Sequence, residues 1–133
     1  MGKPSTVQQT ALVVDDSMLI RHTVCRFLEQ HGFFVSAATN GAEAMQILTT
    51  VLPDLIVTDL MMPKMTGSEL ITAVKADVRL ARIPIVVLAG TSSVREMKPE
   101  GRADYVIRKD IDIEQQLVKA LAETMGLVIE AQT

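Results

Sequence analysis

The sequence predicts an α/β fold built around a parallel β-sheet. Apolar runs of strand length alternate with helix-length amphipathic segments along the chain of 133 residues, an order typical of α/β proteins. Most of the apolar runs are continuous rather than alternating with polar residues, as expected when both faces of a parallel sheet are covered. Because crossovers between parallel strands are right-handed, we expect helices on both faces of this sheet.

Five apolar segments are predicted to be strands. In chain order they are Ala11–Val14, Phe33–Ala37, Leu55–Thr58, Ile85–Leu88 and Tyr105–Ile107. The stretches between them are long enough for a helix, which parallel neighbours need as a crossover connection. The predicted unit is therefore a strand followed by a helix, five times over.

Four segments show the 3.6-residue periodicity of an amphipathic helix. Ser17 is a good N-cap for the first and Gly32 a good terminator, while Asp112 can cap the last. The apolar positions of the four helical faces are, in chain order, Ile20, Val24, Phe27 and Leu28; Ala44, Met45 and Leu48; Leu70, Ile71 and Val74; and Ile113, Leu117, Leu121 and Met125.

The fourth crossover, residues 92–103, departs from this regular pattern. It has little apolar periodicity and contains Pro99 and Gly101. A proline inside a helix removes a hydrogen bond and clashes with the preceding turn, at a cost of ~3 kcal/mol. The sequence therefore predicts a short or irregular fourth helix.

No internal repeat or low-complexity linker divides the chain, and its length suits one domain. We expect that domain over residues 10–126, with a flexible N-terminal arm over residues 1–9 and a C-terminal tail over residues 127–133. The single cysteine, Cys25, excludes an internal disulfide and is expected to be a buried thiol in the first helix.

Composition argues against several classes of function. The net charge is −3 and the pI about 5.3, with no basic run, so direct nucleic-acid binding is not expected. No apolar stretch reaches the ~20 residues that span a bilayer. The polar N-terminus lacks the apolar core of a signal peptide. These features predict a cytoplasmic protein without a membrane partner.

Acidic residues follow two of the predicted strands. Asp59 comes directly after Leu55–Thr58, and Asp15 and Asp16 follow Ala11–Val14. Open α/β sheets place their ligands at the carboxyl ends of the strands, so the three carboxylates should meet there. Two carboxylates ~4 Å apart repel by ~4 kcal/mol at an effective dielectric of about 20. The cluster therefore calls for a cation, and Mg²⁺, which prefers carboxylate oxygens and water, fits best.

An isolated aspartate after a strand is more often a turn residue than a ligand. Here a pair and a lone acid end separate strands, and Pro63 and Gly67 follow Asp59 within eight positions. This combination favours a built site over ordinary turn chemistry.

These residues resemble the signature of the receiver domains of bacterial two-component response regulators. The resemblance runs from about Ala11 to Met125. It rests on the pair Asp15 and Asp16, on Asp59, and on the loop containing Met62, Pro63 and Gly67. Lys109 matches the lysine that ends the fifth strand in the family, with Arg108 as the alternative in the other register.

The resemblance implies a flavodoxin-like three-layer sandwich whose five parallel strands lie in the order 2-1-3-4-5. It also implies that Asp59 is the phosphoacceptor and that Lys109 contacts the phosphoryl group. Asp15, Asp16, Asp59 and the backbone oxygen of Met61 would hold Mg²⁺. The expected partner is a sensor histidine kinase, or a phosphotransfer protein, whose phosphohistidine supplies the phosphoryl group.

A receiver of this kind is not an enzyme in the ordinary sense, although slow autodephosphorylation is expected. The output would be a changed contact with a downstream protein or with an effector domain of a longer protein, and both alternatives stay open. We expect a monomer or a weak dimer.

The chain departs from the family at the end of the fourth strand. Receivers usually carry Ser or Thr there, whereas this chain has Ala89. Thr91, two residues on, is the candidate substitute, and Tyr105 approximates the switch aromatic of the fifth strand. The departure raises an alternative function, a receiver-like scaffold that binds partners without phosphorylation-dependent switching.

Two further classes lack their motifs. A haloacid-dehalogenase phosphatase needs a second Asp two residues after the nucleophile, and Met61 stands there instead. No glycine-rich phosphate-binding motif follows a strand, which argues against a nucleotide-binding domain. His22 and His31 are expected to be surface or helix-end residues rather than phosphodonors.

Overall fold

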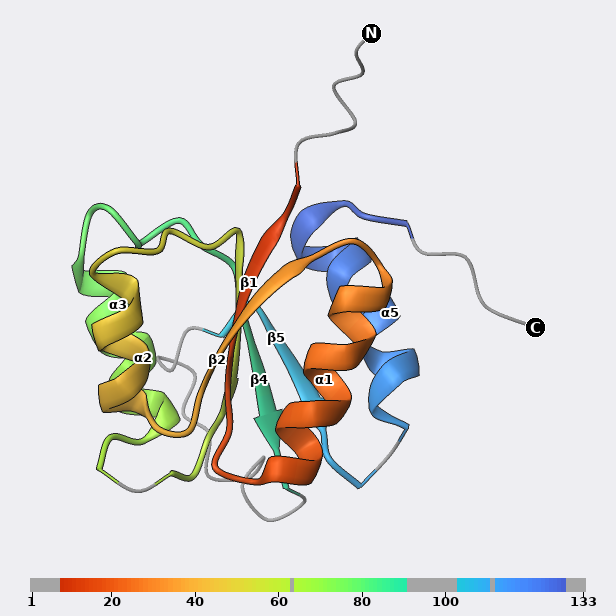
Figure 1. Ribbon diagram of the computed structural model, residues 1–133, viewed down its shortest axis with the longest axis horizontal. Coiled ribbons are helices and arrows are strands. Elements are labelled where there is room, and N and C mark those ends of the chain that lie inside the picture. The colour runs from red at the N-terminus through yellow and green to blue at the C-terminus, as the bar shows by residue number, and fades with distance from the viewer. Residues whose placement is uncertain (1–7, 63, 91–102, 111, 129–133) are drawn as a thin grey trace, which may run out of the picture.

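The structure is a computed structural model that describes residues 8–62, 64–90, 103–110 and 112–128. It contains one parallel sheet in the order β2-β1-β3-β4-β5, which confirms the predicted order (Figure 1). The strands are β1 (Thr10–Val14), β2 (Phe34–Ala38), β3 (Leu55–Asp59), β4 (Ile85–Ala89) and β5 (Tyr105–Arg108). Each lies within one residue of its predicted bounds, and β3 runs one residue further than predicted, so that it includes Asp59.

Helices cover both faces of the sheet, as the right-handed crossovers require. Helices α1 (Met18–Gln30) and α5 (Ile113–Met125) lie on one face, and α2 (Gly41–Leu48) and α3 (Gly67–Ala76) lie on the other (Figure 1). The resulting three layers confirm the predicted sandwich. The irregular fourth helix predicted over residues 92–103 falls almost entirely outside the described residues.

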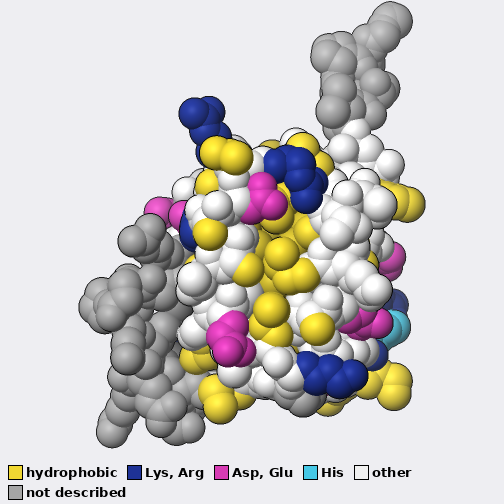
Figure 2. All heavy atoms as spheres, turned by 90° about the vertical axis from the view of Figure 1, so that its left-hand side faces the viewer, with side chains coloured by type: hydrophobic (Ala, Val, Ile, Leu, Met, Phe, Trp, Pro, Cys, Tyr) yellow, Lys and Arg dark blue, Asp and Glu magenta, His cyan; other side chains and the backbone are white. Residues whose placement is uncertain are grey.

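Two apolar clusters fill the space between the layers, one on each side of the sheet. Alternate residues of one strand serve the two clusters: Leu12 and Val14 of β1 face α2 and α3, whereas Ala11 and Val13 face α1 and α5. Strands β3 and β4 are buried along their whole length. Burial on both faces explains why the central strands read as continuous apolar runs. Figure 2 shows the hydrophobic side chains gathered between α2 and α3.

Local capping explains where the helices begin and end. The Ser17 hydroxyl accepts a hydrogen bond from the backbone of Ile20, and Asp112 caps α5 in the same way, as predicted. Thr66 and Glu69 form a capping box at the start of α3. Gly32 follows the end of α1 with a φ of +91°, a left-handed backbone that glycine adopts without strain.

Two further expectations can be compared with the structure. Cys25 is half-buried and packs against the apolar cluster under α1 and α5, so it is less buried than predicted. Among the residues that the structure describes, no helix has the length and apolar character needed to cross a membrane. The division into an arm, a domain and a tail stays a prediction.

Candidate functional site

The three predicted acids meet at the carboxyl edge of the sheet. Strands β1 and β3 are parallel neighbours with Val14 paired to Thr58, so the residues after them emerge side by side. One oxygen from each of Asp15, Asp16 and Asp59 lies within 4.8 Å of the other two. Asp15 is fully buried and Asp59 is 4% exposed, whereas Asp16 is exposed. The predicted convergence is therefore confirmed.

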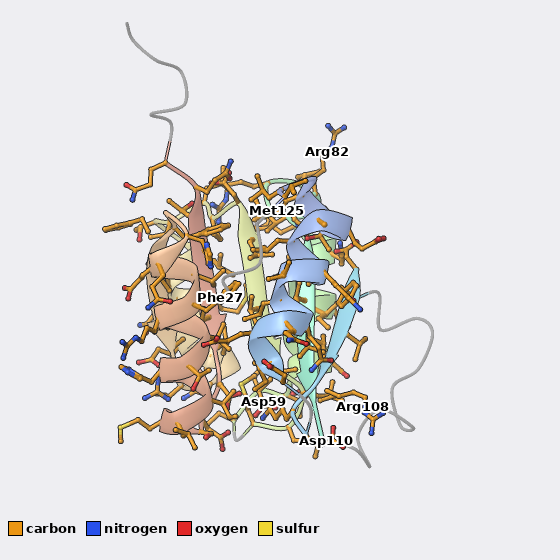
Figure 3. The ribbon with its side chains drawn as sticks, turned by 90° about the vertical axis from the view of Figure 1, so that its right-hand side faces the viewer. Phe27, Asp59, Arg82, Arg108, Asp110 and Met125 are labelled. Atoms are coloured by element: carbon orange, nitrogen blue, oxygen red, sulfur yellow. The ribbon has the colours of Figure 1, made fainter. Side chains whose placement is uncertain are left out.

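Lys109 supplies a positive charge to this cluster. Its backbone N–H donates to the carbonyl of Ala89 at 2.9 Å, which continues the ladder between β4 and β5. From there its Nζ donates to Asp59 Oδ1 at 2.9 Å and lies 3.2 Å from Asp15 Oδ2. Arg108, the alternative in the other register, is exposed and pairs with Asp110 at 3.0 Å (Figure 3). The geometry thus brings Lys109, and not Arg108, to the carboxylates.

One buried oxygen of the cluster lacks a hydrogen bond. Asp15 Oδ1 accepts the backbone N–H of Ser17 at 2.8 Å, but Asp15 Oδ2 has no hydrogen-bond partner among the described residues. Its 3.2 Å approach to Lys109 Nζ is an ion-pair contact without hydrogen-bond geometry. A buried carboxylate oxygen left in this way is costly. A hard cation could be bound by this oxygen, and carboxylate oxygens are the ligands that such an ion prefers. The residues present therefore fit Mg²⁺.

The electrostatics of the site oppose ionisation of Asp59. Burial, with the nearby charge of Asp15 and the approach of Asp16, raises the pKa of Asp59 to about 6, although Lys109 acts in the opposite direction. Burial alone would lower the pKa of Lys109, but the hydrogen bond to Asp59 and the charges of Asp15 and Asp59 outweigh it, so its pKa is raised. Lys109 is therefore a protonated ammonium, and this single positive charge faces three carboxyl groups.

Hydrogen bonds and one close backbone contact fix the backbone around Asp59. The buried hydroxyl of Thr58 donates to the carbonyl of Asp59 at 2.9 Å. The N–H of Gly67 donates to the carbonyl of Leu60 at 2.8 Å, which brings the start of α3 against the end of β3. A Cβ on Gly67 would lie 2.3 Å from the Asp59 carbonyl oxygen. The sequence marks Gly67 only as part of a motif, and this close approach is the physical reason for it.

Sequence reasoning missed one residue of the site, Arg21. It lies off the apolar face of the predicted first helix, and no motif in the sequence includes it. In the structure the Arg21 guanidinium donates from Nη1 to the backbone carbonyl of Asp15 at 2.7 Å. The signal available was the spacing, since a side chain one turn after the N-cap Ser17 can reach back over the start of its helix.

The structure describes most of the remaining predicted residues but does not test their roles. Met61 is 60% exposed in the loop that follows β3. Ala89 is fully buried at the end of β4. Tyr105 begins β5 and packs with the α1 and α5 layer, whereas its neighbour Val106 packs with the opposite layer. Thr91 lies outside the described residues. The backbone oxygen of Met61 as a metal ligand, and the switch roles of Ala89, Thr91 and Tyr105, stay predictions.

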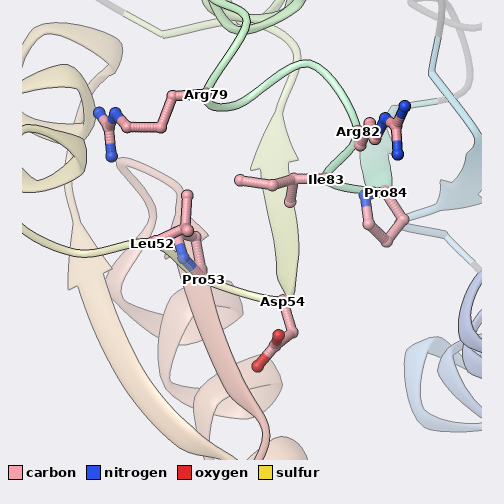
Figure 4. A pocket seen from close by; sticks show the side chains of 7 residues that line it. All are labelled: Leu52, Pro53, Asp54, Arg79, Arg82, Ile83 and Pro84. Carbon is pink, nitrogen blue, oxygen red and sulfur yellow. The ribbon is translucent and has the colours of Figure 1, made fainter.

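A hollow of about 300 Å³ lies at the opposite edge of the sheet (Figure 4). Its walls are mainly Leu52, Pro53, Ile83 and Pro84. Two of its charged groups already have partners within the domain: Asp54 accepts from the backbone and hydroxyl of Thr10, and Arg79 donates to the carbonyl of Leu48. Nothing in this hollow matches the carboxylate cluster, so the acidic edge is the candidate site.

Comparison with known proteins agrees with this geometry. The chain matches the response regulator receiver domain family over residues 11–122. It is 32% identical over 114 residues to the DNA-binding dual master transcriptional regulator RpaA of Synechocystis, covering 84% of this chain and 47% of that protein. A two-component response regulator of Oryza sativa subsp. japonica is 33% identical over 101 residues, covering 73% of this chain and 77% of that protein.

Solved structures share the fold. The chemotaxis response regulator CheY4 of Vibrio cholerae has a TM-score of 0.80 and 29% identity, covering 90% of this chain and all 100% of that one. The receiver domain of a sensor histidine kinase of Pseudomonas aeruginosa has a TM-score of 0.81 at 20% identity, covering 91% and 100%. That structure holds a magnesium ion coordinated in its active site cleft.

Several relatives are much longer than this chain. It spans 8% of a histidine kinase of Formosa agariphila, at 32% identity over 110 residues, and about half of the Synechocystis regulator. The shared part is in each case the domain described above. The match over residues 11–122, together with the sheet order and the carboxylate cluster, shows that the chain belongs to the response regulator receiver domain family.

Proposed function

We propose that this receiver is the phosphoacceptor of a two-component system, and that Asp59 takes a phosphoryl group from the phosphohistidine of a sensor histidine kinase or of a phosphotransfer protein. One observation carries the proposal. The Asp59 carboxylate is 4% exposed and yet lies 2.9 Å from Lys109 Nζ, with two further carboxylates beside it. Such a buried, charge-rich group has no evident packing role, and perturbed pKa values of this kind cluster at functional sites.

The cation in this proposal is Mg²⁺. Carboxylate oxygens of Asp15, Asp16 and Asp59 would hold it, with the backbone oxygen of Met61 as a further ligand. When bound, the ion would supply positive charge that offsets the negative charge of the phosphoryl oxygens. The buried Asp15 oxygen without a hydrogen bond supports this assignment.

The transfer itself is a nucleophilic displacement at phosphorus. A carboxylate oxygen of Asp59 forms the new O–P bond while the N–P bond of the phosphohistidine breaks, and the bonding electron pair returns to the imidazole nitrogen. Phosphoryl transfer depends on positioning and on charge stabilisation more than on covalent chemistry by the protein. Lys109 is suited to the second task, because its ammonium lies beside the carboxylate that would carry the phosphoryl group.

The output follows from the added charge. A carboxylate of charge −1 becomes an acyl phosphate nearer −2 with new acceptor oxygens, and this local change can bias two conformations of the domain. Contacts with a downstream protein, or with an effector domain, would then change. Water would slowly remove the phosphoryl group, and the domain is otherwise not an enzyme.

One observation favours a second candidate, a scaffold that binds partners without phosphorylation-dependent switching. Ala89 is buried at the end of β4 and its side chain offers no hydroxyl to a phosphoryl group on Asp59. The two candidates predict different conformational responses of the domain to a phosphoryl group, so that response separates them and the loading of Asp59 alone does not.

The loading test is direct. The protein is incubated with Mg²⁺ and a small acyl phosphate, and its intact mass is measured. We expect wild type to gain one phosphoryl group only with Mg²⁺ present, and Asp59→Asn to gain none. Asp54→Asn is the matched control, because Asp54 precedes the same strand at its opposite end. Loading of Asp59→Asn, or of wild type without any divalent ion, would contradict the proposal.

A further inference from the structure

The guanidinium of Arg21 is attached to the backbone of the acidic site and not to a carboxylate. Arg21 lies in the first half of α1, half-buried, and its Nη1 donates to the carbonyl oxygen of Asp15 at 2.7 Å. That carbonyl belongs to the peptide bond that joins Asp15 to Asp16. The contact therefore fixes the orientation of the one peptide that connects two of the three acids.

The other hydrogen bonds of Asp15 fix its backbone N–H and its carboxylate. Its N–H donates to Ala38 of β2 at 3.1 Å, and its Oδ1 accepts from the N–H of Ser17 at 2.8 Å. Asp16, by contrast, is exposed, and its place relative to Asp59 depends on the direction in which the chain leaves Asp15. A rotation of the Asp15–Asp16 peptide would carry the Asp16 carboxylate away from the cluster.

We propose that Arg21 is a positioning residue of the cation site: its guanidinium locks the Asp15–Asp16 peptide so that both carboxylates face Asp59. The inference rests on the proposed function, because it concerns how well the site holds Mg²⁺. Groups that orient metal ligands from behind are worth about tenfold to a hundredfold in metal affinity when removed. Arg21 acts on a backbone carbonyl and would not touch the ion.

Charge and positioning make opposite predictions for Arg21. A positive side chain bound to the backbone of Asp15 repels a divalent cation held by the Asp15 carboxylate, so charge alone predicts that its removal strengthens Mg²⁺ binding. Loss of the hydrogen bond to Asp15 predicts weaker binding, because the two ligands are no longer held together. The sign of the change therefore decides between the two effects.

The experiment is a Mg²⁺ titration of the unphosphorylated protein. Binding is measured by calorimetry or by the chemical shifts of backbone amides. We expect Arg21→Ala to bind Mg²⁺ about tenfold more weakly than wild type. Arg21→Lys, which keeps the charge and a donor, should recover part of the affinity. Arg26→Ala is the matched control, because Arg26 is an exposed arginine of the same helix, and it should bind within about twofold of wild type. Affinity of Arg21→Ala equal to or above that of wild type would overturn the proposal, as would equal weakening by Arg26→Ala.

A second variant and a second measurement separate a loss of Mg²⁺ binding from poor folding of Arg21→Ala. Arg21→Met keeps an unbranched apolar side chain at this position without the guanidinium, and must show the same loss of affinity. In folded variants, the rate of loading by a small acyl phosphate should reach nearly the wild-type plateau at saturating Mg²⁺, with half-saturation shifted to higher Mg²⁺. A lowered plateau with unchanged half-saturation would overturn a positioning role.

The two proposals fail in different ways. If wild type binds no Mg²⁺ and gains no phosphoryl group on Asp59, the proposed function is wrong. If wild type does both and Arg21→Ala matches it, the function stands and only the role of Arg21 is refuted.

Discussion

Gly67 lies directly against the backbone of Asp59, with no space for a side chain between them. A Cβ at position 67 would meet the Asp59 carbonyl oxygen at 2.3 Å and the Cα of Leu60 at 2.8 Å. Both atoms belong to the backbone of a buried strand end, so neither can move aside without shifting the acceptor residue. The start of α3 is thus packed against the segment that carries Asp59.

Gly67→Ala is therefore expected to damage both stability and the site. We predict a loss of about 2 kcal/mol or more in the free energy of unfolding, the range of overpacking in a close-packed interior, together with slower phosphoryl loading. Urea unfolding and intact-mass kinetics measure the two effects. Gly90→Ala is the control, because no atom of the residues that the structure describes lies within 4 Å of a Cβ there. A stable Gly67→Ala with wild-type loading would show that the loop yields.

Some of this site can be read from the sequence, because strand ends and their carboxylates are local features. Asp15 and Asp59 each follow a continuous apolar run, and the convergence of parallel strand ends then brings them together. The order of the strands is different. Alternation of strand and helix allows many orders, and the resemblance to receivers, not periodicity, supplied the one that the structure confirms.

Other features depend on tertiary contacts that leave no local pattern. Lys109 and Arg108 were both open from the sequence, and only the register of β5 against β4 brings Lys109 to Asp59. Nothing in the sequence around Arg21 reveals that its side chain donates to a backbone carbonyl of the site. Gly67 was recognisable as a motif, but its steric reason requires the path of β3.

The raised pKa of Asp59 predicts an unusual dependence of stability on pH. The folded value is about 6 against an ordinary value of 3.8, so the folded protein binds more protons than the unfolded chain between these values. The stabilising contribution is therefore fully present below the ordinary pKa and is lost as the pH rises through about 6. In the absence of Mg²⁺, we expect Asp59 to cost on the order of 1–2 kcal/mol at pH 7, after allowance for its coupling to neighbours.

Asp59→Asn removes this titration. Its free energy of unfolding should exceed that of wild type at pH 7, and the difference should shrink as the pH falls from 7 to 5. Urea unfolding at several pH values in the presence of a chelator measures it, with Asp54→Asn as the control. A difference that grows toward acid pH would mean that Asp59 is stabilising when ionised.

The thiol of Cys25 should react slowly, because its surroundings raise its pKa. Burial, with the nearby charge of Glu29, raises the pKa of this thiol, against the smaller opposing effect of Arg21. The thiolate is the nucleophile, so less of the reactive form exists at neutral pH. We expect alkylation by iodoacetamide to be several-fold slower in the folded protein than in urea, and Glu29→Gln to be faster than wild type. Equal rates in folded and unfolded protein would contradict this.

Lys64 adopts a left-handed backbone with a φ of +69° in the loop between β3 and α3. This conformation costs about 1–2 kcal/mol for a residue with a Cβ. Lys64→Gly should therefore leave stability unchanged or raise it by up to about 1 kcal/mol, once the greater freedom of the unfolded chain is deducted. Lys119→Gly, in the exposed interior of α5, should instead lower it by about 1 kcal/mol. Thermal unfolding of the two variants gives the signs, and a destabilised Lys64→Gly would mean that its side chain has a role of its own.

Ala89→Ser tests whether the missing hydroxyl limits the response to phosphorylation. Ala89 is buried at the end of β4, and its carbonyl already accepts the N–H of Lys109, so a hydroxyl added here lies on the strand next to Asp59. It would offer the phosphoryl oxygens a neutral hydrogen-bond donor in addition to Lys109. The net stabilisation by such a hydrogen bond is typically about 1 kcal/mol.

With a beryllofluoride adduct as the phosphoryl mimic, we expect larger changes of amide exchange along β4 and β5 in Ala89→Ser than in wild type. Ala44→Ser, equally buried but in α2, should respond like wild type. Identical responses of wild type and Ala89→Ser would show that this domain signals without help from the end of β4.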